Sequence, residues 1–346
     1  MSGARLLMRE EFRPTERRAP LSPASARDVI RRGVEVSVER SSRRVFRDDE
    51  YAAAGCTLVP AGSWPDASDD VFVLGLKELP EHPAVLRHRH IYFGHAYKNQ
   101  PGARELLRRF TEGGGALLDL ESLVDEEGRR VAAFGYWAGY VGAALAVLRR
   151  RDRLCEPLVP LSRENLDEAL RVAAEPSRAL VIGALGRCGR GAADALTAAG
   201  ADVTRWDLEE TRDLDVTALL DHDIMVNAVL ATGPITPFLT VETLRRPRRL
   251  SVVADVTCDV GSPCHTLPIY DETTTWRDPV RRIGGLDVIA IDNLPSLLPV
   301  ESTVDFAADL APYLAELGGS GAWRRASAAF TAACASHDLN RKEDHV

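Results

Sequence analysis

The sequence RALVIGALGRCGRGAADALTAAGADVTRWD, residues 178–207, decides the fold class of this chain. An apolar, β-prone run enters glycines at positions 183, 186 and 189, and an alanine-rich helical pattern follows. A second β-prone run ends at Asp207, 18 residues after the last glycine. This order of strand, glycine turn, helix, strand and acid is typical of a dinucleotide-binding unit.

Each part of this unit has a physical task in such a site. Gly183, Gly186 and Gly189 let the backbone turn tightly and approach a pyrophosphate, and the helix that begins near Arg187 points its first N–H groups at the phosphates. The carboxylate of Asp207 can accept hydrogen bonds from a ribose diol. The spacing is GxxGxxG rather than GxGxxG, which by itself also fits an ordinary glycine-rich turn. The surrounding strands, helix and acid favour a cofactor of the NAD type.

Composition indicates a globular chain of two domains. Its 346 residues exceed one typical core, and 45% hydrophobic with 27% charged residues fit neither a disordered chain nor a coiled coil. A net charge of −8 argues against a nucleic-acid partner, because phosphate binding needs a basic surface. No apolar run is long enough for a membrane span, and the start MSGARLLMREEF lacks the apolar core of a signal peptide. We therefore expect a cytoplasmic protein, whose oligomeric state the sequence does not determine.

Six cysteines are scattered along the chain, which suits reduced thiols in a reducing compartment. Cys258, Cys264 and His265 offer three ligand types that zinc uses. The two cysteines are separated by a five-residue gap, however, and no fourth ligand stands with them in the sequence. We expect no metal at these residues.

The first half of the chain alternates between predicted strands and helices. Extended runs occur at residues 5–12, 34–39, 71–77, 90–97 and 116–120. Helical patterns separate them, for example at residues 22–33 and 102–114. Alternation of this kind predicts a mostly parallel sheet covered by helices.

The second half completes another sheet of this kind. A long, largely apolar helix is predicted within residues 128–153, and further strands are predicted at residues 223–229, 249–256 and 286–292. The helical tail from Ala311 is expected to return to the first domain. The predicted fold class is α/β, with two doubly wound parallel-sheet domains. Residues 1–130 with about 313–346 are expected to form a substrate and catalytic domain, and residues of about 131–312 a nucleotide-binding domain.

Polar residues stand where two predicted strands of the first half end. Lys77 closes the run VFVLGLK, and His95 and Lys98 close the run IYFGHAYK. A lone lysine at a strand end is usually just solvated, and a lone histidine is usually structural. At the ends of two neighbouring strands, however, Lys77 and His95 form an acid–base pair. A nicotinamide enzyme that oxidises a C–N bond needs such a pair, one group to take the amine proton and one to activate water.

Seven segments carry a wider resemblance: REEFRPTERRAPLSP (9–23), VPAGSW (59–64), LGLKELPE (74–81), GHAYKNQ (94–100), DLESLVDEEGRRVAAFGYWAGYVGAAL (119–145), VIGALGRCG (181–189) and IDNLPSLLPVE (291–301). In one order from about residue 9 to 335, the chain is similar to the saccharopine dehydrogenase family, which is NAD-dependent and L-lysine-forming. The resemblance implies two Rossmann-like domains, as in alanine dehydrogenase and transhydrogenase, with an active site in the interdomain cleft. It also implies a reaction that converts saccharopine, water and NAD into lysine, 2-oxoglutarate and NADH.

The resemblance implies roles for individual residues in catalysis. Lys77 would be the base near the secondary amine, and His95 the acid–base group for water addition and release of lysine. Glu78 and Glu121 would adjust the charge of these groups, since a nearby carboxylate favours a protonated lysine. Lys98, in the same segment as His95, would contact the substrate.

Other implied roles concern the two ligands. Arg18 and Arg130 would hold substrate carboxylates, for which the planar guanidinium fork is well shaped. Asp207 would contact the adenosine ribose, and Asp292 the nicotinamide side of NAD. The implied substrate is thus a small molecule with several carboxylates.

The chain departs from the family's pattern at several positions. The family commonly carries lysine at the position of Arg13, arginine at that of Val300, and asparagine-rich sequence at residues 262–266. A cysteine usual in the family is replaced by Ala228, so Cys188 lacks its implied disulfide partner. Two alternatives stay open beside the cleavage of saccharopine. One is a relative that acts on another N6-substituted lysine or opine-like secondary amine, and the other is a catalytically silent NAD-binding regulator.

Overall fold

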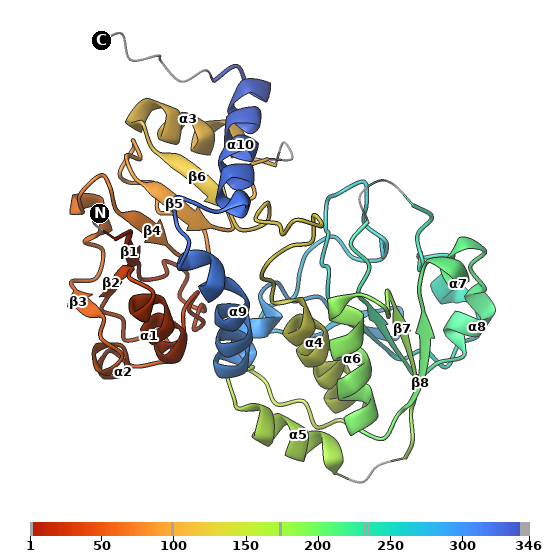
Figure 1. The fold of residues 1–346 in the computed structure, drawn as a ribbon. Coiled ribbons are helices and arrows are strands. Elements are labelled where there is room, and N and C mark those ends of the chain that lie inside the picture. Colours follow the sequence, from red (N-terminus) through yellow and green to blue (C-terminus); the bar gives the residue numbers. More distant parts are fainter. Residues whose placement is uncertain (1–2, 98–99, 173–174, 232, 234, 340–346) are drawn as a thin grey trace. The chain divides into compact units, whose positions relative to one another are not determined.

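The chain divides into two compact units. The computed structural model describes residues 3–97, 100–172, 175–231, 233 and 235–339. The first unit comprises Met1–Ala133 and Thr303–Val346, and the second comprises Phe134–Ser302. Each unit is built around one sheet of six strands, which Figure 1 shows in red to yellow for the first unit and in green to blue for the second.

The first unit has a parallel sheet in the order β3-β2-β1-β4-β5-β6. Its strands are β1 (Arg5–Met8), β2 (Glu35–Glu39), β3 (Thr57–Val59), β4 (Phe72–Leu74), β5 (Arg89–Tyr92) and β6 (Ala116–Asp119). Strands β4 and β6 are buried along their whole length, as expected where a parallel sheet is covered on both faces. The strand order reverses between β1 and β4, and ligands of such sheets bind beside the carboxyl ends of strands at this point.

Helices pack against this sheet on the described part of the chain (Figure 1). They are α1 (Pro23–Arg31), α2 (Asp48–Ala53), α3 (Ala103–Gly113) and α10 (Gly321–Ser336), with the 3-10 helix η1 (Trp64–Asp66). Helix α1 begins where the side chain of Ser22 accepts a hydrogen bond from the backbone N–H of Ser25 and Pro23 occupies the first turn. Helix α10 packs against α3 and β6, so the end of the described chain belongs to the first unit. The division between the units falls within α9 (Pro299–Leu314).

The second unit has a sheet in the order β11-β12-β10-β9-β7-β8, which is parallel except for the pairing of β11 with β12. Its strands are β7 (Arg178–Ile182), β8 (Asp202–Trp206), β9 (Ile224–Asn227), β10 (Val252–Asp255), β11 (Arg281–Ile283) and β12 (Leu286–Ile289). The order reverses between β7 and β9, directly beside the glycine turn that follows β7. The two sheets confirm the predicted pair of α/β domains with mainly parallel strands.

Two helices of the second unit pack unusually closely. Its helices are α4 (Gly135–Arg150), α5 (Arg163–Arg171), α6 (Arg187–Ala198), α7 (Leu208–Arg212) and α8 (Val216–Leu220), with the 3-10 turns η2 (Thr243–Arg245) and η3 (Leu294–Leu297). A Cβ atom at Gly139 of α4 would lie 1.8 Å from the carbonyl oxygen of Cys188, and one at Gly191 of α6 would lie 1.9 Å from that of Tyr136. The predicted long apolar helix is therefore α4, and its small residues allow close contact with α6.

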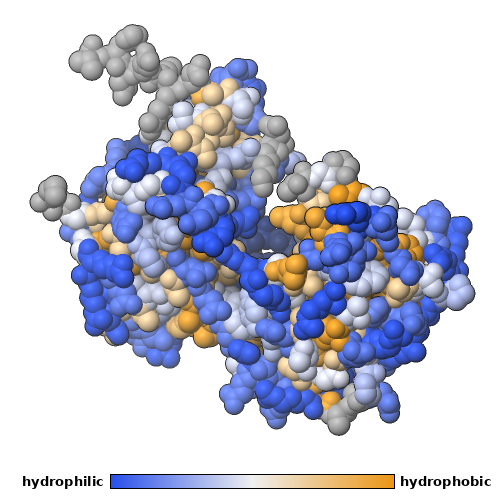
Figure 2. Space-filling model, turned by 45° about the vertical axis from the view of Figure 1, so that its right-hand side comes forward, coloured by the Kyte–Doolittle hydropathy of each residue, from blue (hydrophilic) through white to orange (hydrophobic). Residues whose placement is uncertain are grey.

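The surface drawn in Figure 2 is mainly hydrophilic, with apolar residues in separate patches. Two large apolar side chains are exposed beside the glycine turn of the second unit, Leu185 and Leu208, each with 74% of its surface accessible. None of the described helices combines the length and the apolarity that crossing a bilayer requires.

Candidate active site

Four of the predicted site residues follow neighbouring strands of the first sheet. Lys77 and Glu78 come after β4, His95 comes after β5, and Glu121 comes after β6. These strands are adjacent and parallel, so their carboxyl ends meet at one edge of the sheet. A backbone hydrogen bond of 3.2 Å from Phe93 N–H to the carbonyl oxygen of Leu76 extends the pairing up to the residue before Lys77. The edge of the sheet thus gathers two carboxylates, a lysine and a histidine.

His95 is held between an acid and an aromatic ring. Its Nδ1 atom lies 3.4 Å from Oε2 of Glu121, and its ring stacks on that of Phe93 at an interplanar angle of 18°. The backbone of His95 has a φ of 49°, a left-handed conformation that is uncommon outside glycine. The His95 side chain is 60% exposed, whereas that of Glu121 is only 17% exposed. This arrangement presents the imidazole to solvent while a shielded carboxylate orients it.

Glu121 also links His95 to a predicted substrate-binding residue. Its Oε1 atom lies 3.4 Å from Nη2 of Arg130, so the two oxygens of one carboxylate face a histidine and an arginine. Asp119, at the end of β6, accepts a hydrogen bond of 2.8 Å from the backbone N–H of Glu121. Burial raises the pKa of Asp119, and its hydrogen bond from Glu121 offsets only part of that rise. Sequence reasoning missed Asp119, although an acid at the end of an apolar strand run is a signal for such a residue.

Glu78 is paired with one of the residues that depart from the family's pattern. Nε of Arg13 lies 2.6 Å from Oε1 of Glu78, within the distance of a charge-assisted hydrogen bond. Partial burial would raise the pKa of Glu78, but the hydrogen bond and charge of Arg13 lower it below its usual range. Glu78 is therefore a carboxylate at neutral pH, and Arg13 neutralises part of its charge.

Arg18 is buried with a carboxylate that sequence reasoning missed. Its Nε and Nη2 atoms lie 2.8 and 2.7 Å from the two oxygens of Glu16, and only 4% of Arg18 and 2% of Glu16 are exposed. This bidentate pair occupies one edge of the guanidinium. A substrate carboxylate would have to bind at another edge of Arg18, so the residue serves first as the partner of Glu16. The predicted contact residue Lys98 lies outside the described residues.

Two further charged residues lie where the strand order of the first sheet reverses. Arg9 and Glu11 follow β1 directly, and both side chains are buried. Glu11 accepts hydrogen bonds from the backbone N–H groups of Leu76 and Lys77, at 2.7 and 3.0 Å. The signal for these residues is a run of charged residues placed immediately after a buried strand.

The three glycines of the second unit have different structural roles. Gly183 has a φ of 83°, and its carbonyl oxygen accepts a hydrogen bond of 3.2 Å from the N–H of Gly186, which closes the tight turn after β7. A Cβ atom at Gly189 would lie 2.1 Å from the carbonyl oxygen of Gly183, so this glycine permits the close approach of α6 to the turn. A Cβ atom at Gly186 would meet only that same oxygen, at 3.4 Å. The positive φ therefore explains Gly183 and packing explains Gly189, whereas neither requires a glycine at position 186.

The start of α6 has the geometry of an anion site. Gly186 is its N-cap and has no side chain to accept the first N–H groups, and the exposed Arg187 is the first helical residue. The N-terminus of a helix carries partial positive charge and unpaired N–H donors. A pyrophosphate placed here would accept hydrogen bonds from these N–H groups and face the guanidinium of Arg187.

Asp207 lies beside a depression of the second unit. Its Oδ2 accepts a hydrogen bond of 2.9 Å from the N–H of Leu185, and its Oδ1 accepts one of 2.9 Å from the N–H of Leu208. The carboxylate also accepts from the backbone N–H of Glu210 in a capping box, and its remaining lone pair can accept a ribose hydroxyl. The depression is lined by Ala184, Leu185, Arg205, Trp206, Asp207, Leu208, Glu209, Glu210 and Arg212. Apolar Leu185 and Leu208 beside an acid fit a nucleoside, with an apolar base and a polar sugar.

Asp292 lies after β12 and is exposed, next to Asn293 with a left-handed φ of 77°. It lies near enough to Cys258 to affect that thiol: burial, then the charges of Asp255 and Asp292, raise the pKa of Cys258 far above its ordinary value. Cys258 is therefore a neutral thiol. None of the six cysteines, Cys188 included, forms a disulfide, and no group of three potential metal ligands gathers among the described residues.

A buried polar network lies at the ends of β9 and β10, and sequence reasoning missed it. Asp255, 1% exposed, accepts hydrogen bonds from Nδ2 of Asn227 at 2.9 Å and from the hydroxyl of Tyr270 at 2.7 Å. Nε2 of His265 lies 3.8 Å from Oδ2 of Asp255, close enough for an ion pair when the imidazole is protonated. Burial would raise the pKa of Asp255, but His265, Tyr270 and Asn227 together lower it. His265, considered above as a zinc ligand, thus serves as a neighbour of Asp255.

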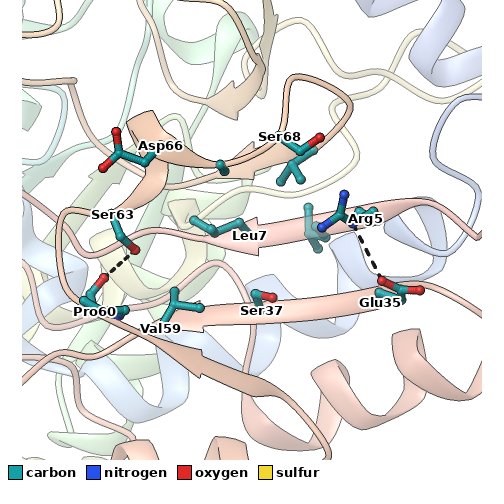
Figure 3. A pocket seen from close by; sticks show the side chains of 12 residues that line it. Arg5, Leu7, Glu35, Ser37, Val59, Pro60, Ser63, Asp66 and Ser68 are labelled. Carbon is teal, nitrogen blue, oxygen red and sulfur yellow. Dashed lines mark hydrogen bonds and ion pairs between the residues drawn. The ribbon is translucent and has the colours of Figure 1, made fainter.

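A separate pocket lies over β1 and β2, and Figure 3 shows its lining. Nε of Arg5 lies 3.7 Å from Oε2 of Glu35, and the hydroxyl of Ser63 donates to the carbonyl oxygen of Pro60 at 2.7 Å. Two pairs thus form among the residues drawn there, Arg5 with Glu35 and Ser63 with Pro60. None of the predicted site residues lines this pocket, so it is separate from the candidate active site.

Two family models match the chain. The family model for the alanine dehydrogenase/PNT N-terminal domain matches residues 7–141, and the model for the C-terminal domain of the same family matches residues 213–340. The saccharopine dehydrogenase [NAD(+), L-lysine-forming] of Emericella nidulans is 42% identical over 348 residues, which cover 92% of this chain and 93% of the relative. The enzyme of the same name from Schizosaccharomyces pombe is 42% identical over 345 residues, covering 92% and 94%.

Solved structures are similar in fold. An L-alanine dehydrogenase matches with a TM-score of 0.70 and 20% identity, covering 94% of this chain and 93% of its own. The transhydrogenase of Sinorhizobium meliloti matches with a TM-score of 0.66 and 18% identity, covering 90% of this chain and 93% of its own. At these identities the match concerns the fold alone.

Proposed function

Since the chain belongs to the family of NAD-dependent, L-lysine-forming saccharopine dehydrogenases, we propose that it cleaves saccharopine oxidatively to L-lysine and 2-oxoglutarate. The overall step consumes one NAD and one water and yields one NADH and one proton. The observation that carries the proposal is the gathering of Lys77, His95 and Glu121 at one edge of the first sheet. A silent regulator would not need this acid–base set, so that alternative is not favoured.

The second unit supplies the residues that fit NAD. We propose that Gly183, Gly186 and Gly189, with Arg187, receive the pyrophosphate at the start of α6. Asp207 accepts the adenosine ribose hydroxyls in the adjoining depression, and Asp292 serves the nicotinamide side. When bound, NAD supplies the acceptor for the hydride.

In the proposed mechanism, Lys77 and His95 divide the proton transfers. Hydride leaves the substrate carbon readily only when the adjacent nitrogen has lost its proton, and Lys77, as a neutral amine, takes that proton. Water then adds to the imine carbon. His95 takes a proton from that water and returns one to nitrogen. As the C–N bond breaks, His95 accepts the proton of the added hydroxyl group, which becomes the keto oxygen of 2-oxoglutarate, and lysine leaves as the amine. The carboxylate of Glu121, 3.4 Å from His95, stabilises the imidazolium that forms when His95 takes up a proton.

Two arginines of the first unit fit the substrate's carboxylates. Arg130 is 36% exposed at its side chain and is oriented by Glu121, so it can offer a second edge of its guanidinium to a carboxylate. Arg18, held by Glu16, can contribute positive charge from a buried position. Lys98 stays a proposed substrate contact by its place in the sequence. We also propose a cytoplasmic location and no nucleic-acid partner, on the reduced cysteines and the net charge of −8.

The proposed function is tested by following NADH formation with saccharopine, alanine, glutamate and a panel of N-alkyl amino acids. The proposal expects saccharopine to be turned over best, with lysine and 2-oxoglutarate formed in equal amounts to NADH. Efficient turnover of alanine with none of saccharopine would contradict it and indicate an alanine dehydrogenase. A clear preference for another secondary amine would favour the alternative of an enzyme that acts on a different N-substituted amino acid.

A further inference from the structure

Arg9 and Glu11 form a buried ion pair just after β1. Nη1 of Arg9 lies 3.4 Å from Oε2 of Glu11, and the two side chains are 1% and 8% exposed. Burial raises the pKa of Glu11, and the charge of Arg9 offsets part of this rise. Because a buried ion pair often stabilises a fold no more than apolar residues would, its presence calls for another explanation.

The contacts of this pair converge on the backbone of one residue. Glu11 accepts a hydrogen bond of 3.0 Å from the N–H of Lys77 and one of 2.7 Å from the N–H of Leu76. Nη2 of Arg9 donates to the carbonyl oxygen of Lys77. The pair therefore binds Lys77 from both sides, at its N–H and at its C=O. Both peptide planes that flank the Lys77 side chain are fixed by buried charged groups.

A glycine makes room for this arrangement. A Cβ atom at Gly75 would lie 2.5 Å from Nε and 2.6 Å from Cζ of Arg9. Any larger residue there would displace the guanidinium of Arg9. The N–H of Arg9 donates to the carbonyl oxygen of Leu74 at 2.9 Å, which fixes the start of the same segment to β4. Gly75, Arg9 and Glu11 thus form one unit around Lys77.

We propose that Arg9 and Glu11 are positioning residues that hold the backbone of Lys77 so that its amine points at the proton to be removed. This inference rests on the proposed role of Lys77 as the base. A flexible lysine side chain has many rotamers, and fixing its origin reduces the set of orientations that its amine can adopt. A displacement of about 1 Å at such a group costs up to about a hundredfold in rate.

The test is a double-mutant cycle between Glu11→Gln and Lys77→Met in the full chain. Glutamine keeps the size of Glu11 but replaces one acceptor oxygen by a donor that faces a backbone N–H. We expect Glu11→Gln to lower kcat for saccharopine about 10- to 100-fold and to change KM for saccharopine less than about threefold. In the Lys77→Met background the same substitution should lower kcat less than about threefold further, because the group that it positions is gone.

Two further variants distinguish a specific loss of positioning from a general loss of structure. Gly75→Ala disturbs Arg9 without removing either charge, and it should reproduce the loss of kcat. Tyr51→Phe is the control: it removes a buried hydrogen bond of 2.6 Å to the carbonyl oxygen of Leu21 in the same unit, and it should lower thermal stability but not kcat.

Different outcomes identify different errors. If Lys77→Met loses activity while Glu11→Gln and Gly75→Ala keep wild-type kcat, the positioning role is wrong and the role of Lys77 stands. If Glu11→Gln lowers kcat by the same factor in the Lys77→Met background as in the wild type, the two effects are independent, and this also contradicts the positioning role. Wild-type kcat in Lys77→Met itself contradicts the proposed base, and the positioning role with it.

Discussion

Nδ1 of His95 lies 3.4 Å from Oε2 of Glu121, and this pair joins the ends of two neighbouring strands. Because Nδ1 faces the carboxylate, proton exchange with a substrate falls to Nε2 on the other side of the ring. The ring of Phe93 stacks on the imidazole and limits its rotation. One strand end thus supplies the proposed acid–base group, and the next supplies a carboxylate beside it.

The glycine turn offers a prediction that separates packing from cofactor binding. Gly189→Ala should destabilise the protein by about 1–3 kcal/mol, because its Cβ would overlap the carbonyl oxygen of Gly183. Gly186→Ala meets only an ordinary contact at 3.4 Å and should change stability by less than about 1 kcal/mol. It should nevertheless raise the Kd for NADH about tenfold or more, if the pyrophosphate approaches this backbone. Urea denaturation and NADH fluorescence titration measure the two effects, and equal NADH affinity in Gly186→Ala and wild type would count against this site.

Asp207 should decide between the two nicotinamide cofactors. Its carboxylate repels a 2′-phosphate, so the wild type should prefer NAD. Arg205 and Arg212 line the same depression and would attract that phosphate once the carboxylate is gone. Asp207→Asn removes the charge and keeps one of the two acceptor oxygens, so that either the N–H of Leu185 or that of Leu208 loses its acceptor. Without the charge, the preference for NAD should fall about tenfold or more.

The readout for Asp207 is kcat/KM with each cofactor. Asp213→Asn removes a charge at the end of α7 and is absent from the lining of the depression, so it is the matched control and should leave the ratio unchanged. A wild type that uses NADP as well as NAD would overturn the assignment of Asp207.

The buried network around Asp255 predicts a pH-dependent contribution to stability. The folded-state pKa of Asp255 is lowered, so its ionised form stabilises the fold above the ordinary aspartate pKa of about 3.9, and this contribution is lost as the pH falls through the lower folded-state value. Asp255→Asn leaves a buried donor without an acceptor and should cost about 1–3 kcal/mol at pH 7. The difference from wild type should shrink on acidification, because only the wild type loses the contribution of the carboxylate.

Urea denaturation at neutral and acidic pH measures this difference. Tyr270→Phe, which removes one donor but keeps the carboxylate, should show a smaller cost at neutral pH. A stability difference between Asp255→Asn and wild type that stays constant with pH would show that Asp255 does not titrate as described.

The sequence predicts most of the second unit, because its determinants are local. One glycine of the turn needs a φ of 83°, and the Cβ of another would overlap a carbonyl oxygen a few residues away. Such local requirements place glycines at a fixed spacing that can be recognised in the sequence. Strand ends of the first sheet could be located for the same reason, since apolar runs end in polar residues. The predicted runs 71–77 and 90–97 are longer than the observed strands, however: β4 ends at Leu74 and β5 at Tyr92, so Lys77 and His95 follow the strand ends by a few residues.

Pairings between distant segments could not be predicted in this way. Glu11 bonds the backbone of Lys77 across 66 positions, and Asn227 bonds Asp255 across 28. Only the strand order brings these residues together, and their spacing along the chain does not indicate that they are in contact. The pairing of Arg18 with Glu16 is local in sequence. Whether the guanidinium of Arg18 contacts solvent or a carboxylate depends on its burial, however, and the tertiary fold determines that burial.

The central claim is that Lys77 and His95 divide the proton transfers of an amine oxidation, and the pH profile of kcat/KM for saccharopine in Lys77→Met and His95→Gln tests it most directly. Each substitution should lower kcat about 10²- to 10⁴-fold, the usual effect of removing a positioned acid–base group, while NADH affinity stays nearly unchanged. In at least one variant, the fall of kcat/KM on one side of the pH optimum should also disappear. Near-wild-type kcat with an unchanged profile in both variants would contradict the account.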